Sequence, residues 1–278
     1  MKGEAFCIDM RRFADGSFCS RIHWRQGMYL LLAFFGSLAI ASAQTRTGQQ
    51  TQSVISTLIT WLPFILKGFG LNLLMSFIAM ALATVLGIGL GLMQVSRSRL
   101  VRLPARVVTH LFRNSPWLVI LFVVMFLIPI QIRLHGLQIM IPDWIKATIA
   151  FSLPVLANIS EIMRGAINSI PKGQWESAES LAFTHAQTLR WVILPQCVKR
   201  SIPPWMNWYA LLALATPMAS ILGVNEALGN AQAAMESAGA RTEFLLPFYL
   251  FLLCLFFAYI YPVAILTRKI ERKYAVVN

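Results

Sequence analysis

The sequence predicts an all-α, polytopic membrane protein, and three observations carry that prediction. Of its 278 residues, 57% are hydrophobic and only 13% are charged, which excludes an ordinary soluble domain. Apolar runs of the length needed to cross a bilayer recur along the chain. Lys and Arg gather in alternate loops between these runs, as expected for a protein inserted with a fixed orientation.

The apolar runs predict five core transmembrane helices. They cover 69–95, 117–130, 144–163, 205–223 and 244–266. The second run is short for a span, so its helix has to begin upstream.

A shorter apolar piece, 58–66, precedes the first span and carries Pro63. Because proline disfavours a continuous helix, we expect an interfacial segment there that leads into the first span.

Residues 1–60 form an N-terminal extension with a hydrophobic segment at 27–43. A basic region, this apolar segment and the triplet Ala41-Ser42-Ala43 together resemble a cleavable signal peptide. An uncleaved sixth helix is the alternative. Both place Gln44 outside the cell, so the five core spans keep the same orientation.

The basic residues cluster at 1–26, 96–116, 164–204 and 268–273. This distribution predicts a cytoplasmic N-terminus, a cytoplasmic loop 164–204 and a cytoplasmic tail 271–278, in a multi-pass protein of the bacterial inner membrane. The net charge of +13 is also typical of nucleic-acid binders. Here the charges lie next to membrane ends, so contact with the lipid bilayer explains them and no nucleic-acid partner is expected.

The sequence contains no motif for catalysis, metal binding or a cofactor. Its four histidines are scattered, and no phosphate-binding loop or nucleophile motif is present. Gly87 and Gly91 lie inside an apolar helical run, where this spacing favours close helix packing. We therefore expect a non-enzymatic protein, and any active transport has to draw energy from a partner or an ion gradient.

Glu161 is the only carboxylate that we expect inside a span. It precedes Arg164 by three residues, a spacing that predicts an ion pair on one helix face. A single carboxylate provides no chain of groups to relay protons, which disfavours a gradient-driven carrier.

A polar block interrupts the apolar runs, and its composition predicts one helix over 174–189. Pro195 is expected to stop or kink the following segment, and Pro203-Pro204 to break it again. An amphipathic helix held between such corners can dock into another protein or lie on the membrane. Glu176 and Glu179 favour the protein partner, because helices on membrane surfaces prefer Lys and Arg.

The same block resembles a motif of the membrane subunits of ABC importers. The family pattern is E-A-A, three residues, G, nine residues, I-x-L-P. It stands here as Glu176-Ser177-Ala178, then Ala182, then Val192-Ile193-Leu194-Pro195, with the spacing intact. Ala182 is the departure that matters most, because alanine lacks the backbone freedom of the family's glycine.

The flanking sequence is similar to the polar amino-acid permease branch, the histidine, glutamate, glutamine, arginine and opine type. The similar segments are 160–165, 169–174 and Arg113-Asn114-Ser115-Pro116, and the resemblance extends over about 68–270. It therefore implies a permease domain over 61–270. One departure lies at 214–218, where Leu-Ala-Thr-Pro-Met replaces the branch's charged K-D-T-S-L stretch. Pro217 is also expected to break the helix locally.

The resemblance implies a permease subunit that translocates a polar amino acid or similar small solute from periplasm to cytoplasm. Its implied partners are a cytoplasmic ABC ATPase dimer, a periplasmic solute-binding protein and a second permease subunit, identical or sister. A stand-alone channel, a gradient-driven carrier and a non-transporting scaffold subunit remain as alternatives.

Three sets of candidate residues follow. The ATPase-coupling set is Lys172, Gly173, Glu176, Ser177, Ala178, Ala182, Ile193, Leu194 and Pro195. The structural set is Arg113, Pro116, Glu161 and Arg164. A polar solute needs polar partners along its path, and the candidates are Asn72, Ser76, Asn158, Ser160, Asn207, Thr216, Met218 and Ser220. For the polar members of that path, hydrogen bonding between helices is the alternative role.

Overall fold

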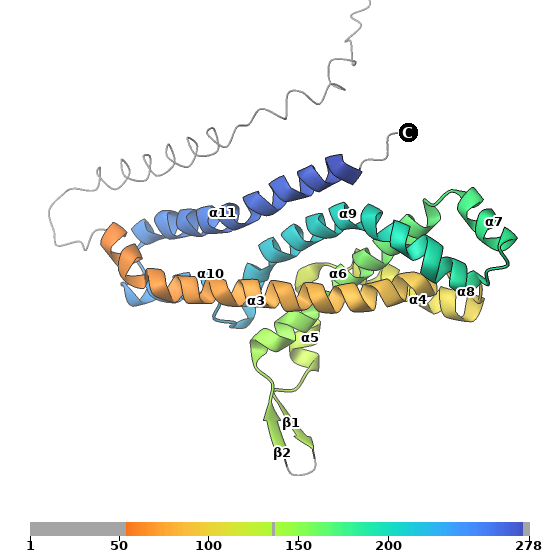
Figure 1. Ribbon diagram of the computed structural model, residues 1–278. Coiled ribbons are helices and arrows are strands. Elements are labelled where there is room, and N and C mark those ends of the chain that lie inside the picture. Colours follow the sequence, from red (N-terminus) through yellow and green to blue (C-terminus); the bar gives the residue numbers. More distant parts are fainter. Residues whose placement is uncertain (1–53, 135–136, 275–278) are drawn as a thin grey trace, which may run out of the picture. The chain divides into compact units, whose positions relative to one another are not determined.

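The computed structural model describes residues 54–134 and 137–274 (Figure 1). The predicted hydrophobic segment 27–43 lies outside them. The long helices are α3 (Val54–Gln94), α4 (Arg99–Asn114), α5 (Trp117–Leu127), α6 (Asp143–Asn168), α9 (Leu194–Ala215), α10 (Ala227–Ser237) and α11 (Thr242–Tyr274). The shorter elements are strands β1 (Gln131–Leu134) and β2 (Leu137–Met140), helices α7 (Lys172–Ser180) and α8 (His185–Gln187), the π-helical turn η2 (Thr188–Ile193) and the 3-10 helix η3 (Thr216–Leu222).

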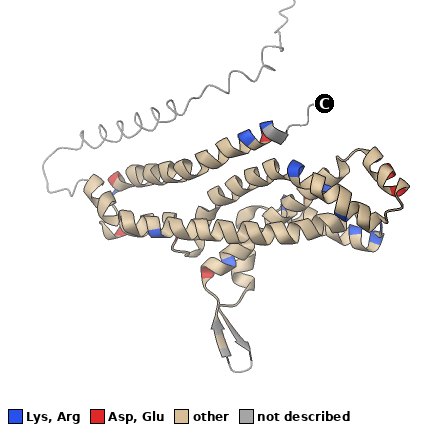
Figure 2. Ribbon diagram, viewed as in Figure 1, with Lys and Arg blue, Asp and Glu red and all other residues tan. Residues whose placement is uncertain are grey.

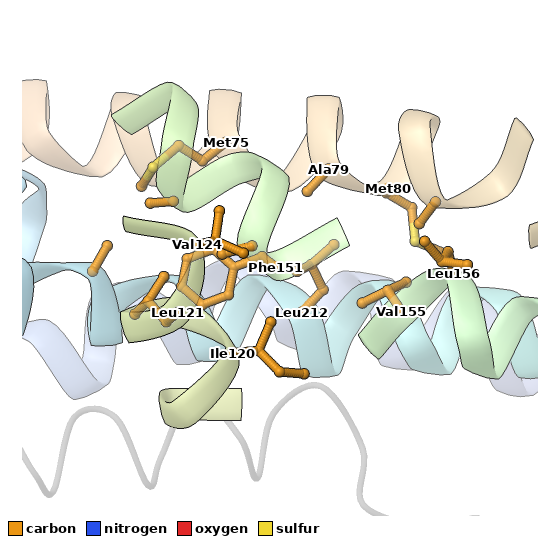
Figure 3. Close-up of a cluster of buried hydrophobic side chains, with 14 of the residues drawn as sticks. Met75, Ala79, Met80, Ile120, Leu121, Val124, Phe151, Val155, Leu156 and Leu212 are labelled. Carbon is orange, nitrogen blue, oxygen red and sulfur yellow. The ribbon is translucent and has the colours of Figure 1, made fainter. Parts of the chain in front are cut away.

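Helix α6 lies at the centre of the compact unit formed by residues 58–278. In its most apolar stretch 72% of residues are buried, against 33% in α3 and 22% in α11. Helices α4, α5 and α9 all pack against it, and α11 packs on α9. Figure 3 shows Phe151 of α6 among side chains from α3, α5 and α9, including Met75, Leu121 and Leu212. The remaining faces of α3 and α11 are exposed and apolar, as suits contact with lipid.

The predicted close packing at Gly87 and Gly91 is confirmed. A Cβ atom added at Gly87 would lie 2.8 Å from the Leu156 carbonyl oxygen, and one at Gly91 would lie 2.8 Å from the Ser160 carbonyl oxygen. Only glycine therefore lets α3 approach the backbone of α6 this closely. Gly89, between them, has open space on its Cβ side.

The described helices include three that are long and apolar enough to cross a membrane, namely α3, α6 and residues 242–272 of α11. Two further pairs of helices are long and apolar enough to cross a membrane only when the two members are taken together, and each pair is bent. Helices α4 and α5 meet at 108°, and the stretch 185–222 meets α10 at 45°. The five predicted runs correspond to five candidate spans when each bent pair is counted as one span. Figure 2 shows that the middle stretches of α3, α9 and α11 carry no charge and that charges gather toward their ends.

Two expectations about proline are wrong. The piece 58–66 is not a separate segment, because α3 continues through Pro63. Helix α9 likewise continues through Pro203 and Pro204, and Pro195 lies in its first turn, where proline is tolerated. At Pro217 the prediction is confirmed, because the α-helix there gives way to η3.

The helical fold class is confirmed, with one addition that the sequence analysis did not predict. Strands β1 and β2 pair antiparallel, with Gln131 opposite Met140 and Leu134 opposite Leu137. They join the end of α5 to the start of α6.

Candidate functional site: the segment 171–193

The predicted single helix over 174–189 is wrong, because α7 ends at Ser180. Its last turn closes in a Schellman motif, in which the Ala182 N–H donates to the Glu179 carbonyl (2.9 Å) and the Phe183 N–H donates to the Ala178 carbonyl (3.1 Å). Ala182 has φ +58°, the left-handed conformation that this motif requires. This is the position at which the family motif has glycine, so alanine stands here in a strained conformation.

A second helix start follows at once. Thr184 caps α8 in a capping box, because its hydroxyl accepts from the Gln187 N–H while the Gln187 side chain accepts from the Thr184 N–H. Thr-x-x-Gln is a sequence signal for a helix start, and it was available in the sequence. The helix-forming composition of residues 174–189 instead favoured one continuous helix.

The segment is anchored to the membrane helices by an apolar cluster. Ile193 and Cys197 pack with Met163, Ala166 and Ile167 at the end of α6 and with Ile170, just after it. Trp175 of α7 packs against this cluster and also stacks on His185, with ring centroids 5.3 Å apart.

Two side chains of α9 add polar ties. Gln196 donates to the Gln174 side chain (3.2 Å). Arg200 donates to the carbonyl and the hydroxyl of Ser169 (2.9 Å each), at the end of α6. These contacts tie α7 to α9 and the end of α6 to α9.

The outer surface of the segment is free. Glu176 and Ser177 are exposed, whereas Ala178 is 4% exposed and faces inward. Large apolar side chains project beside them, with Leu181 70% exposed and Trp191 66% exposed. Of the other predicted coupling residues, Lys172, Gly173 and Pro195 are exposed, Leu194 is half-buried and Ile193 is buried.

The predicted pair of Glu161 and Arg164 is confirmed, with Nη2 to Oε2 at 2.7 Å and Nε to Oε1 at 3.2 Å. Arg113 joins it, 3.3 Å from the same Oε2 atom, so one carboxylate ties α4 to α6. Pro116 caps α5 directly after α4 ends. The motif 113–116 therefore holds the sharp bend between α4 and α5.

Two of the predicted path residues meet in a buried polar cluster. The Asn72 amide donates to the Thr216 hydroxyl (3.0 Å) and to a Glu226 carboxylate oxygen (2.8 Å), and its oxygen accepts from the Ala227 N–H (3.0 Å). Glu226 is fully buried and caps α10 by accepting from the Leu228 and Gly229 N–H groups.

Glu226 was missed by the sequence analysis. It lies beyond the end of the predicted run 205–223, and the bend that returns it to the interior has no apolar periodicity to reveal it. The asparagine at 72 was the one available signal, because a buried amide needs partners.

The other path candidates lie elsewhere. Ser76 lies 3.4 Å from the Tyr209 hydroxyl, and Asn158 bonds the Pro154 carbonyl one turn earlier in α6. Ser160 belongs to a separate buried network with Gln94 and Thr109. Met218 and Ser220 are half-buried, and Asn207 is exposed.

Comparison with known proteins supplies the family. Residues 83–276 match the model of the binding-protein-dependent transport system inner membrane component. The chain belongs to this family. Its members are transport components. Among the residues that the structure describes, no group of three or more His, Cys, Asp or Glu side chains could hold a metal ion.

Relatives of this chain match most of its length. It is 36% identical over 214 residues to the probable amino-acid ABC transporter permease protein YckA of Bacillus subtilis (strain 168), covering 77% of this chain and 90% of the relative. It is 31% identical to the L-cystine transport system permease protein TcyB of the same organism, covering 76% and 86%.

Solved structures share the fold. An amino acid ABC transporter crystallised with histidines matches with a TM-score of 0.68 at 24% identity, covering 81% of this chain and 100% of that one. The MetNI methionine ABC transporter in an inward-facing conformation matches with a TM-score of 0.61 at 17% identity, covering 77% and 97%.

Proposed function

We propose that this chain is the transmembrane permease subunit of an ATP-driven ABC importer, which moves an amino acid or similar small solute from periplasm to cytoplasm. Its partners would be a cytoplasmic ABC ATPase dimer, a periplasmic solute-binding protein and a second permease subunit. Family membership supports the transport role, and the names of the relatives support the amino-acid class.

The observation that carries the coupling role is the contrast between the two sides of segment 171–193. Its outer side exposes Glu176, Leu181 and Trp191, and the Arg190 guanidinium lies over the Trp191 ring, 5.1 Å from its centroid. Its inner side is fastened to α6 and α9 by the cluster around Ile193. A helix that is free outside and rigidly held inside can receive force from a docked ATPase and pass it to the spans.

We further propose that the chain lies in a bacterial inner membrane with segment 171–193 and the C-terminus in the cytoplasm. The distribution of Lys and Arg supports this orientation. Asn72 and Thr216 are buried and join three segments through hydrogen bonds, which supports the alternative role for these two path candidates, hydrogen bonding between helices.

The test is a charge reversal at Glu176. The tagged full-length chain is purified in detergent from its own host, and the ATPase that co-purifies is assayed together with solute uptake by the cells. Glu176→Lys is expected to abolish co-purification and uptake while the chain stays in the membrane. Glu236→Lys is the matched control, because Glu236 is also exposed but lies on α10. Ala178→Asp should also reduce co-purification and uptake. It should destabilise the fold as well, because Ala178 is buried.

Wild-type co-purification and uptake in Glu176→Lys would contradict the coupling role. Solute flux through the reconstituted chain alone, without ATP, would instead support a gradient-driven carrier. A scaffold role would be supported by two results together: the ATPase co-purifies with the tagged chain, and a strain that lacks the chain shows unchanged uptake.

A further inference from the structure

A polar cavity lies where the end of α3, helix α4 and the end of α6 meet. Its volume is about 180 Å³, and it is lined by Gln94, Val95, Arg102, Arg106, Arg164 and Asn168. A single water needs ~15 Å³ of such volume, so the cavity has room for a polyatomic ion. The cavity lies outside segment 171–193 and outside the buried polar cluster of Asn72, Thr216 and Glu226.

Three arginines line this cavity. Arg102 and Arg106 are four residues apart on α4 and therefore lie on one face, and Arg164 comes from α6. Arg164 is already paired with Glu161, whereas Arg102 and Arg106 form no ion pair with any carboxylate in the described ranges. The planar donors of arginine match the oxygens of a phosphate group, so an oxyanion is the ligand that fits this lining.

The other face of α4 locates the cavity relative to the bilayer. Leu100 (88% exposed), Leu103 (66%), Val107 (60%) and Leu111 (59%) follow helical spacing and form a bare apolar stripe. A helix with one basic face and one exposed apolar face is typical of the interface between lipid headgroups and acyl chains. The 108° bend to apolar α5 fits a helix that lies along this interface.

We propose that this cavity binds a phosphate group. In the membrane its source is the headgroup of an anionic phospholipid, because α4 places the arginines at headgroup depth. Free phosphate offers the same chemistry and is the other source. Asn168 lies four residues before α7 begins, so a bound phosphate would contact the base from which the coupling segment extends. The site is independent of the proposed transport function.

The first test measures thermal unfolding of the full-length chain in uncharged detergent. Short-chain phosphatidylglycerol, short-chain phosphatidylcholine and inorganic phosphate are titrated separately. Phosphatidylglycerol should raise the Tm to a plateau, and phosphatidylcholine should leave it unchanged. If inorganic phosphate gives the same plateau at a similar midpoint, the phosphate site stands and its ligand is free phosphate. No saturable shift with either phosphatidylglycerol or phosphate overturns the proposal.

The second test compares two pairs of substitutions with the same loss of charge. Arg102→Gln with Arg106→Gln should weaken the phosphatidylglycerol midpoint by about tenfold or more, because two charge-assisted contacts are lost. Arg99→Gln with Arg268→Gln removes two exposed charges outside the cavity and should leave the midpoint within about twofold. Equal weakening by both pairs would show diffuse attraction of lipid to a basic surface and would overturn the site.

Discussion

Helix boundaries in the membrane core and in segment 171–193 are set by different forces. In the core, α3 and α6 each continue through proline, at Pro63 and at Pro154. In the segment, α7 ends after nine residues although no proline follows it until Pro195.

The surroundings explain the difference. In hydrocarbon every unpaired N–H or C=O group costs several kcal/mol, so a helix keeps its remaining hydrogen bonds even where proline removes one. In water the backbone finds other partners, and local caps decide where a helix ends. The comparison therefore predicts that substitutions in the packing or the buried polar groups of the core reduce stability strongly. Substitutions at the helix caps of segment 171–193 should change stability little.

The largest effect is expected at Glu226. Glu226→Ala leaves the Leu228 and Gly229 N–H groups and the Asn72 amide without their buried acceptor, and should reduce stability by about 3 kcal/mol or more. Thermal unfolding in detergent measures it. Glu236→Ala, at an exposed site of the same helix, should change the Tm little. Similar Tm values for both variants would mean that the buried cluster contributes little to stability.

Glycine packing between α3 and α6 should give the next effect. Gly91→Ala pushes a methyl group to within 2.8 Å of a carbonyl oxygen of α6 and should destabilise by about 1–3 kcal/mol. Gly89→Ala, two residues earlier, meets open space and should be neutral or stabilising, because alanine is the better helix former. The same unfolding assay compares the two. Equal losses in the two variants would contradict the role of the close contact between Gly91 and α6.

In the segment, loss of the capping box should cost about 1 kcal/mol locally. Thr184→Val removes the hydroxyl that accepts from the Gln187 N–H, whereas Thr184→Ser keeps it. Hydrogen exchange of the 185–188 amides should accelerate in the valine variant and stay near wild type in the serine variant. Unchanged exchange in both would mean that the cluster around Ile193, rather than the cap, holds α8.

The smallest effect, and the one with the opposite sign, is expected at Ala182. Ala182→Gly relieves the left-handed strain and should stabilise the turn by about 0.5–1 kcal/mol after the entropy that glycine loses on folding is subtracted. Ala186→Gly makes the same change inside α8 and should destabilise instead. Slower exchange at the Phe183 amide in the first variant and faster exchange around residue 186 in the second would confirm both signs.

The sequence predicted what depends on apolar runs and spacing. The five spans, the pair of Glu161 and Arg164, the packing at Gly87 and Gly91 and the break at Pro217 all follow from local pattern. The pattern did not reveal Glu226, because its burial depends on how α10 returns against α3, where Gly68 allows contact with the backbone of Glu226. The turn at Ala182 was not predicted, because residues 174–189 are rich in helix formers throughout. The capping signal at Thr184 was the only local sign of a second helix start.

Photo-cross-linking from the coupling segment tests the central claim most directly. A photoreactive residue replaces Leu181, which is 70% exposed beside the Schellman turn, or Leu246, which is 66% exposed on α11. After irradiation of membranes from the native host, the Leu181 position should form an adduct with an ABC ATPase, and the Leu246 position should form none. An ATPase adduct at both positions, or at neither, would contradict a specific docking role for segment 171–193.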